Sequence, residues 1–104
     1  MILHTVLCRL RPAHDPVELR DVMVGLSGLK IDGFLWFEHG PNVDAEGKTP
    51  QYPYGVVCAF ADRAALDRYA ADPAHRALGG RLVALCDGGA GGILVSDIQT
   101  GGGA

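Results

Sequence analysis

Cationic residues are few in this chain and never clustered. Nine Lys and Arg stand against twelve Asp and Glu in 104 residues, the formal net charge is −3, and the cations are scattered singly. A nucleic-acid interface needs grouped Lys and Arg to neutralise phosphates. We therefore expect no nucleic-acid partner.

Paired cysteine motifs and long apolar runs are also missing. The three cysteines, Cys8, Cys58 and Cys86, are an odd number without CxxC spacing. This argues against a disulfide framework or a zinc site and favours reduced core residues. Residues 1–9 contain no basic leader, and their apolar run is far shorter than a membrane span. We expect a cytoplasmic protein with no membrane partner.

What the chain does contain is a regular alternation of strand and helix patterns. Apolar and β-branched runs predict strands, while Asp-Pro pairs and an Asp before an apolar stripe predict helix starts. Glu18, three residues after Asp15, fits a capping box. The predicted strands cover 2–10, 31–38, 54–61 and 93–98, and the predicted helices begin after Asp15, Asp62 and Asp72. Residues 39–53 read as a long loop, 1–98 as a single domain and 99–104 as a flexible Gly-rich tail.

The order of these elements predicts an α+β fold of the ferredoxin-like βαββαβ type. Such a fold has a four-stranded antiparallel sheet with helices on one face. The predicted strands carry apolar side chains on both faces, for example Leu3 and Leu7 opposite Ile2 and Val6. Because the face without helices would otherwise be exposed, we expect the protein to be a homodimer that packs through this open sheet face.

The stretch from Tyr69 to His75 combines a helix break with two side chains capable of proton chemistry. Asp72 fits an N-cap and Pro73 the first helical turn, which places His75 at the third helical position. There the positive end of the helix dipole disfavours an imidazolium, so a neutral, proton-accepting His75 is expected. A second histidine, His4, is the polar residue on an otherwise apolar strand face, and it needs a buried hydrogen-bond partner.

The ordered set of these features resembles the stress-responsive dimeric α/β-barrel (Dabb) family. The matching pieces are the opening strand with His4, the Gly40-Pro41-Asn42 turn, Tyr54-Gly55 before Phe60, Tyr69-x-x-Asp-Pro-Ala-His75, and Asp97. The resemblance implies a dimeric α/β barrel built from two ferredoxin-like sheets. It also implies a pocket, because a plant member is a polyketide cyclase whose Tyr and His match Tyr69 and His75. A first-strand pocket histidine of that cyclase matches His4, whereas Asp72 and Tyr54 stand where it has histidines.

These observations leave several functional hypotheses. The first is a pocket for a small hydrophobic or aromatic carbonyl ligand, lined by His4, Tyr54, Cys58, Tyr69 and His75. An enzymatic form of it is a cyclase or isomerase that needs no cofactor, with His75 as general base and Tyr69 as an orienting donor.

Three other interpretations remain open. In a non-catalytic dimeric stress protein, His4 and His75 would satisfy each other or the backbone. A metal site would use His4, Glu38, His39 and His75, although these lie on separate elements without short ligand spacing. A haem- or oxygen-using monooxygenase is suggested by analogy of fold alone.

Overall fold

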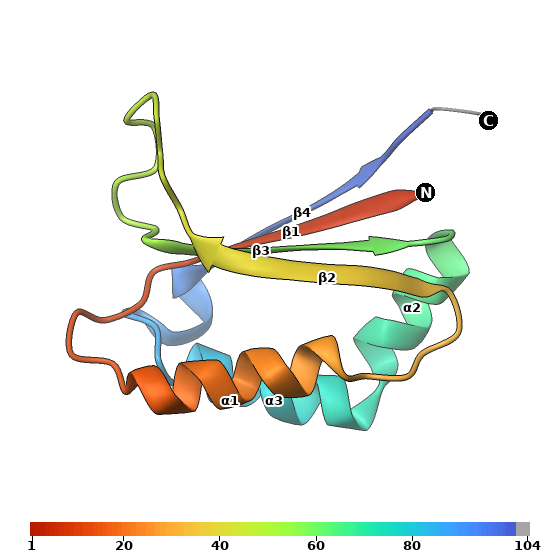
Figure 1. Ribbon diagram of the computed structural model, residues 1–104, viewed down its shortest axis with the longest axis horizontal. Coiled ribbons are helices and arrows are strands. Elements are labelled where there is room, and N and C mark those ends of the chain that lie inside the picture. The colour runs from red at the N-terminus through yellow and green to blue at the C-terminus, as the bar shows by residue number, and fades with distance from the viewer. Residues whose placement is uncertain (102–104) are drawn as a thin grey trace.

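The computed structural model describes residues 1–101 and shows a four-stranded sheet with three α-helices (Figure 1). In chain order the elements are β1 (Ile2–Cys8), α1 (Pro16–Ser27), β2 (Phe34–Pro41), β3 (Tyr54–Phe60), α2 (Arg63–Ala71), α3 (Pro73–Val83), the short 3₁₀ helix η1 (Gly89–Gly92) and β4 (Ile93–Gln99). β4 runs one residue past the predicted domain end at 98, and residues 102–104 of the predicted tail lie outside the described residues.

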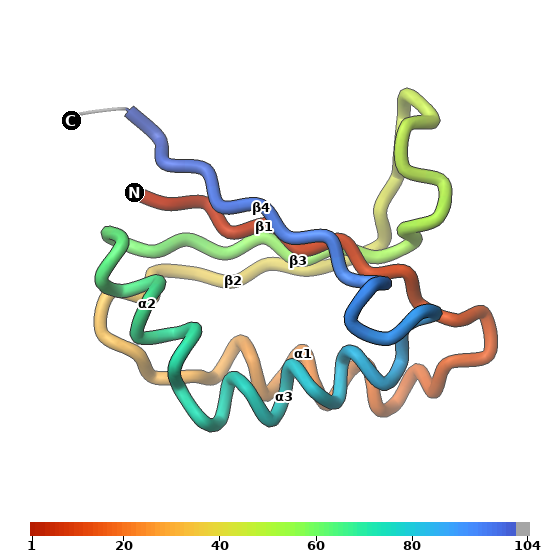
Figure 2. Tube along the Cα trace, turned by 180° about the vertical axis from the view of Figure 1, so that it is seen from behind, coloured from red at the N-terminus to blue at the C-terminus, as the bar shows by residue number. Residues whose placement is uncertain are grey.

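The strands form one antiparallel sheet in the order β2-β3-β1-β4. Helices α1, α2 and α3 all lie on the same side of it, as Figures 1 and 2 show from opposite directions. This confirms the predicted ferredoxin-like arrangement. β1 is central, so His4 lies opposite Cys58 of β3 on one side and opposite Asp97 of β4 on the other.

Aspartate side chains start all three helices. The carboxylate of Asp15 accepts a hydrogen bond from an amide of the first turn of α1, and Asp62 does the same for α2, both at 2.9 Å. Asp72 accepts from the amides of Ala74 and His75 at 2.9 and 3.0 Å. Each bond satisfies an N–H group that has no partner inside the helix, which is why the helices begin where the sequence predicts.

The predicted capping box at Glu18 is wrong. The Glu18 carboxylate turns away from the start of α1 and accepts from the Arg81 guanidinium of α3 at 2.6 and 3.0 Å. A guanidinium can bind both carboxylate oxygens at once, which a single backbone N–H cannot. Glu18 therefore ties α1 to α3.

The second strand lies three residues later than predicted, at 34–41 instead of 31–38. Gly33 has a φ of +86°, which turns the chain before the strand can begin, and its carbonyl accepts from Ala61 N–H at 2.8 Å. The register with β3 then shifts between Phe34 and Trp36, so Leu35 is an extra residue at a bulge. As a consequence, His39 lies on the strand and the connecting loop covers only residues 42–53.

The core lies between the sheet and the helices. Alternate residues of β1 and β3 point to this side, and their partners come from one stripe of α1 and from α2 and α3. Phe60, Met23 and Val22 are the largest fully buried side chains. Within residues 1–101, no helix is long and apolar enough to cross a membrane.

The other face of the sheet, called the open face below, is not covered by helices in the part of the chain that the structure describes. It exposes large apolar side chains on its edge strands, among them Trp36 on β2 and Leu94 and Ile98 on β4. The 42–53 loop rises on this side, away from the helices (Figure 1). The prediction of apolar residues on both faces is thereby confirmed.

Replacing Gly33 with Ala should destabilise the fold for two reasons. The residue has a positive φ, and an added Cβ would lie 2.5 Å from the Cβ of Ala65 in α2. We expect the free energy of unfolding in urea to fall by at least about 2 kcal/mol. Gly47→Ala is the matched control, because Gly47 also has a positive φ, +67°, but an added Cβ there meets nothing within 4 Å. Equal losses in the two variants would contradict the proposed clash with α2.

Candidate functional site

Three side chains from three different elements meet between the sheet and the helices. His4 points inward from β1, Tyr69 lies in the last turn of α2, and His75 lies in the first turn of α3. The ring centroids of Tyr69 and His75 are 3.9 Å apart, and those of His4 and Tyr69 are 5.7 Å apart. The structure thus brings together three of the five predicted pocket residues.

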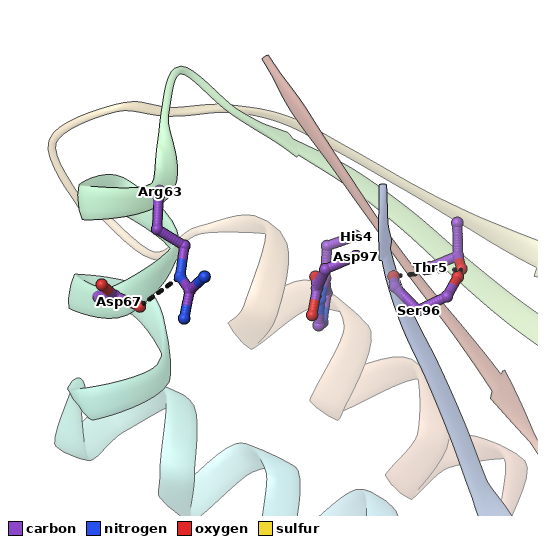
Figure 3. Close-up of polar contacts among 6 residues, drawn as sticks. All are labelled: His4, Thr5, Arg63, Asp67, Ser96 and Asp97. Carbon is purple, nitrogen blue, oxygen red and sulfur yellow. Dashed lines mark hydrogen bonds and ion pairs between the residues drawn. The ribbon is translucent and has the colours of Figure 1, made fainter. Parts of the chain in front are cut away.

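His4 has a hydrogen-bond partner, as the sequence requires, and this partner is the exposed residue Asp97. His4 Nδ1 donates to the Asp97 carboxylate at 2.5 Å, and Figure 3 shows the two side chains together where β1 and β4 run side by side. The His4 side chain is 12% exposed and that of Asp97 is 38% exposed. Because an ionised carboxylate can only accept, Asp97 fixes the proton on Nδ1 and directs Nε2 of His4 away from itself.

His75 is half-buried, and its Nδ1 atom lacks such a side-chain partner. Within residues 1–101, its Nδ1 is inaccessible to solvent and has no hydrogen-bond partner. Burial, and after it the nearby His4 imidazole, lower the pKa of His75, and the carboxylate of Asp72 and the backbone carbonyl of Tyr69 offset only part of this effect. The lowered pKa favours a neutral His75 imidazole at neutral pH, with burial as the main cause and not the helix dipole from which the sequence predicted it.

Tyr69 completes the group with a protonated hydroxyl. Burial strongly raises the pKa of its phenol, and the neighbouring Cys58 adds to this effect. The ring packs on Phe60 and Phe34, with centroid distances of 4.8 and 5.4 Å. Tyr69 is thus a rigid aromatic wall whose hydroxyl can act as a hydrogen-bond donor.

Two cavities adjoin these three residues. A polar one of about 450 Å³ opens between α2 and the ends of β1 and β4, and an apolar one of about 350 Å³ extends under β4 toward α3. His4, Tyr69 and His75 line both. The polar cavity is further lined by Arg63, Asp67, Asp97 and Gln99, and the apolar one by Val6, Leu26, Val56, Leu82, Ile93 and Val95.

Cys58 and Tyr54, the other two predicted ligand-binding residues, do not line these cavities, although Cys58 is packed next to Tyr69. Cys58 is fully buried on β3 opposite His4, and its burial raises the pKa of the thiol to about 12, so it is an inert core residue. Tyr54 lies at the other end of β3, where its hydroxyl hydrogen-bonds His39 Nδ1. It lines a separate cavity near Leu10 and Pro41. Neither side chain lines the two cavities at His75.

Two alternative arrangements of the histidines do not fit the geometry. His4 pairs with Asp97, so the two histidines do not hydrogen-bond each other; of the two arrangements in the non-catalytic hypothesis, each other or the backbone, the geometry disfavours only the first. Glu38 and His39 lie on β2, which β3 separates from β1 and His4. In the described part of the chain, no three His, Cys, Asp or Glu side chains form a group that could hold a metal ion.

Sequence reasoning missed the polar side chains at the mouth of the larger cavity. Arg63 and Asp67 pair at i,i+4 on α2, at 3.1 Å, and Figure 3 shows Arg63 reaching into the space between α2 and the strands β1 and β4. Their spacing is visible in the sequence, but it fits an ordinary solvent-exposed pair equally well. In the sequence Asp97 belongs only to the family pattern, because its pairing with His4 depends on strand register.

Comparison with solved structures supports the same fold. A dimeric ferredoxin-like protein of unknown function from Jannaschia sp. CCS1 is 42% identical, with a TM-score of 0.89, over 95% of this chain and 98% of that one. A Dabb family protein from Mesorhizobium loti is 28% identical, with a TM-score of 0.72, over 97% of each chain.

More distant matches share the fold alone. The cofactor-independent oxygenase SnoaB from Streptomyces nogalater is 16% identical, with a TM-score of 0.73, over 96% of this chain and 92% of that one.

No curated protein matches this chain. The model of the stress responsive A/B barrel domain matches residues 2–99, and the chain therefore belongs to the Dabb family, as the pattern of its residues predicted.

Proposed function

We propose that this Dabb protein is a homodimer that binds a small hydrophobic or aromatic carbonyl compound between its sheet and helices. The observation that carries the proposal is the meeting of a polar and an apolar cavity at His4, Tyr69 and His75. Sites for small molecules are typically apolar hollows with a few convergent polar groups, which is the arrangement here.

Each part of such a ligand has a matching surface. The apolar or aromatic portion would lie against the valines and leucines beneath β4, next to the Tyr69 ring. A carbonyl oxygen would accept a hydrogen bond from the Tyr69 hydroxyl, which stays protonated because of its raised pKa. The part of the His75 ring that lines both cavities would lie against a polar group of the ligand. None of these contacts needs a cofactor.

A second candidate is catalysis at the same site, favoured by the opposite protonation preferences of Tyr69 and His75. The neutral His75 can take a proton from the carbon next to a carbonyl group, while the Tyr69 hydroxyl donates to the oxygen on which negative charge develops. This is the first step of an aldol cyclisation or an isomerisation, and general base catalysis contributes about 10²- to 10⁴-fold in rate. The similarity to SnoaB covers the fold only and does not transfer its reaction.

The homodimer is proposed to form through the open face. Trp36 is 42% exposed, Leu94 50% and Ile98 56%, and all three lie on the edge strands of this sheet. Large apolar groups gathered on one face of a small protein mark an interaction surface. The 42% identical protein from Jannaschia is dimeric, which supports the same assembly for this chain.

Filling the apolar cavity should abolish ligand binding without harming the fold. Gly79 lines this cavity, and a Cβ added there meets nothing within 4 Å, so we expect Gly79→Leu to occupy the space meant for the ligand. In wild type, aromatic ketones and β-keto acids at about 100 times their Kd should stabilise the protein by about 2.7 kcal/mol and raise its Tm by several degrees. Gly79→Leu should lose this shift.

Gly80→Leu is the matched control, because Gly80 is the next residue of α3, is exposed, and also has nothing within 4 Å of an added Cβ. It should keep the ligand-induced shift. Turnover of the same compounds by the catalytic mechanism proposed above should fall at least about 100-fold in His75→Gln. A ligand response that survives in Gly79→Leu, or no response in wild type to any such compound, would contradict the binding proposal.

Acid should destabilise the wild-type protein more than a variant without His75. The pKa of His75 is lowered in the folded state, so its contribution to stability is complete above the unfolded pKa of about 6.5 and is lost as the pH falls below it. The free energy of unfolding in urea, measured at pH 7.5 and 5.5, should therefore drop more for wild type than for His75→Gln. An equal drop in both proteins would show that His75 is not held neutral.

Sedimentation or light scattering at micromolar concentration should show a homodimer. Because the open face carries the exposed apolar side chains, Ile98→Glu should shift the protein toward monomer, since burying an unpaired charge in an interface is costly. Val24→Glu, which changes an exposed apolar residue on α1, should leave the dimer intact. A stable wild-type monomer would count against the proposed assembly.

A further inference from the structure

The apolar cavity beside His75 contains one side chain with a full positive charge, that of Arg76. Arg76 follows His75 in α3 and lines this cavity together with Gly79, Leu82 and Val83 of the same helix. Among residues 1–101, no other Lys, Arg, Asp or Glu lines it. A single cation in an otherwise apolar hollow favours ligands that carry the opposite charge.

The Arg76 side chain spans the distance from the cavity to the solvent. The residue is exposed although it lines the cavity. An arginine in such a position covers apolar surface with its methylene stem and keeps the guanidinium group in water, here at the rim of the cavity. Burial and then His4 lower the pKa of His75, and the Arg76 charge adds a smaller effect of the same sign. The charge at the rim is therefore felt at the His75 ring.

The guanidinium group of Arg76 has no counter-ion in the part of the chain that the structure describes. The ion pairs of residues 1–101 involve three other arginines and His4, but not Arg76. The carboxylate nearest to it in the sequence is that of Asp72, about one helical turn earlier. Its Oδ1 atom accepts from the amides of Ala74 and His75 instead. Arg76 thus keeps its charge available for an anion that enters the site.

Arg63, the arginine that lines the polar cavity, is neutralised within the protein. Its Nε atom donates to the Asp67 carboxylate at 3.1 Å (Figure 3). A second carboxylate of that cavity, Asp97, pairs with His4. Two carboxylates therefore stand against one arginine there, and they would repel an anionic group of a ligand. The polar cavity suits the neutral end of a ligand, and the rim at Arg76 suits the charged end.

We propose that Arg76 binds a carboxylate group of the ligand, so that hydrophobic or aromatic keto acids are preferred; this inference rests on the binding function proposed above. The carboxylate would lie at the rim, the apolar body against the cavity wall and the keto group at Tyr69. A guanidinium group can donate two parallel hydrogen bonds to a carboxylate. One unpaired positive charge also matches the single negative charge of a carboxylate, whereas a phosphate monoester carries about −1.5 to −2.

The test compares benzoylpropionate with its methyl ester, which are the same aromatic ketone with and without a carboxylate charge. Isothermal titration calorimetry of wild type should give a Kd for the acid about fivefold below that for the ester, since a charge contact at an exposed position contributes modestly. In Arg76→Gln the acid should bind as weakly as the ester, while the Kd of the ester stays unchanged and shows that the pocket is intact.

Salt should have the same effect on wild type as the loss of Arg76. Between ionic strengths of about 0.01 M and about 1 M the Debye length falls from about 30 Å to about 3 Å, so a charge contact at the rim is screened. The preference for the acid should therefore disappear at the higher ionic strength. A preference that is independent of salt would contradict an ion pair at the rim.

Arg20→Gln is the matched control for the change in net charge. Arg20 is an exposed arginine of α1 that lines neither cavity and has no ion pair among residues 1–101. This variant should keep the preference for the acid. Equal Kd values for acid and ester in wild type, a preference that survives in Arg76→Gln, or one lost equally in Arg20→Gln would overturn the role of Arg76 while the pocket stands. No binding of either compound would overturn the pocket itself, so the two failures are distinguishable.

Discussion

The junction between α2 and α3 is the constraint on which the site depends. The Asp72 carboxylate binds the amides of Ala74 and His75, which ends one helix and starts the next. In an uninterrupted helix, residues six positions apart point in directions about 120° apart and are separated by about 9 Å along the axis. Because the chain turns at Asp72, Tyr69 and His75 instead lie with ring centroids 3.9 Å apart.

Burial then gives these two side chains complementary chemistry. The same loss of water contact raises the pKa of the Tyr69 phenol and lowers that of the His75 imidazole, so both are neutral. One is a hydrogen-bond donor and the other a proton acceptor. This burial leaves one polar atom unsatisfied, because Nδ1 of His75 is buried without a hydrogen-bond partner within residues 1–101. Most buried polar atoms in folded proteins have a hydrogen-bond partner, so this atom sets the site apart from the rest of the core.

The central strand β1 contributes side chains to hydrogen bonds on both faces of the sheet. Its inward residue His4 pairs with Asp97 at the cavity, and its outward neighbour Thr5 pairs with Ser96 on the open face. These four residues belong to the same two strands, so packing on the open face would hold the strand that positions His4. In this way an assembly through the open face would stiffen one wall of the pocket without contributing a side chain to it.

Much of the protein could be predicted from local patterns, because they depend on neighbours in sequence. The aspartate caps, the alternation of strand faces and the place of His75 in the first turn of α3 are of this kind. The start of β2, the distance of Tyr54 from His75 and the pairing of Asp97 with His4 could not be predicted in this way. They depend on register between segments up to 93 residues apart, as for His4 and Asp97. A slip of two residues keeps the same pattern of inward and outward side chains while changing every cross-strand partner, so only the packed sheet decides which side chains meet.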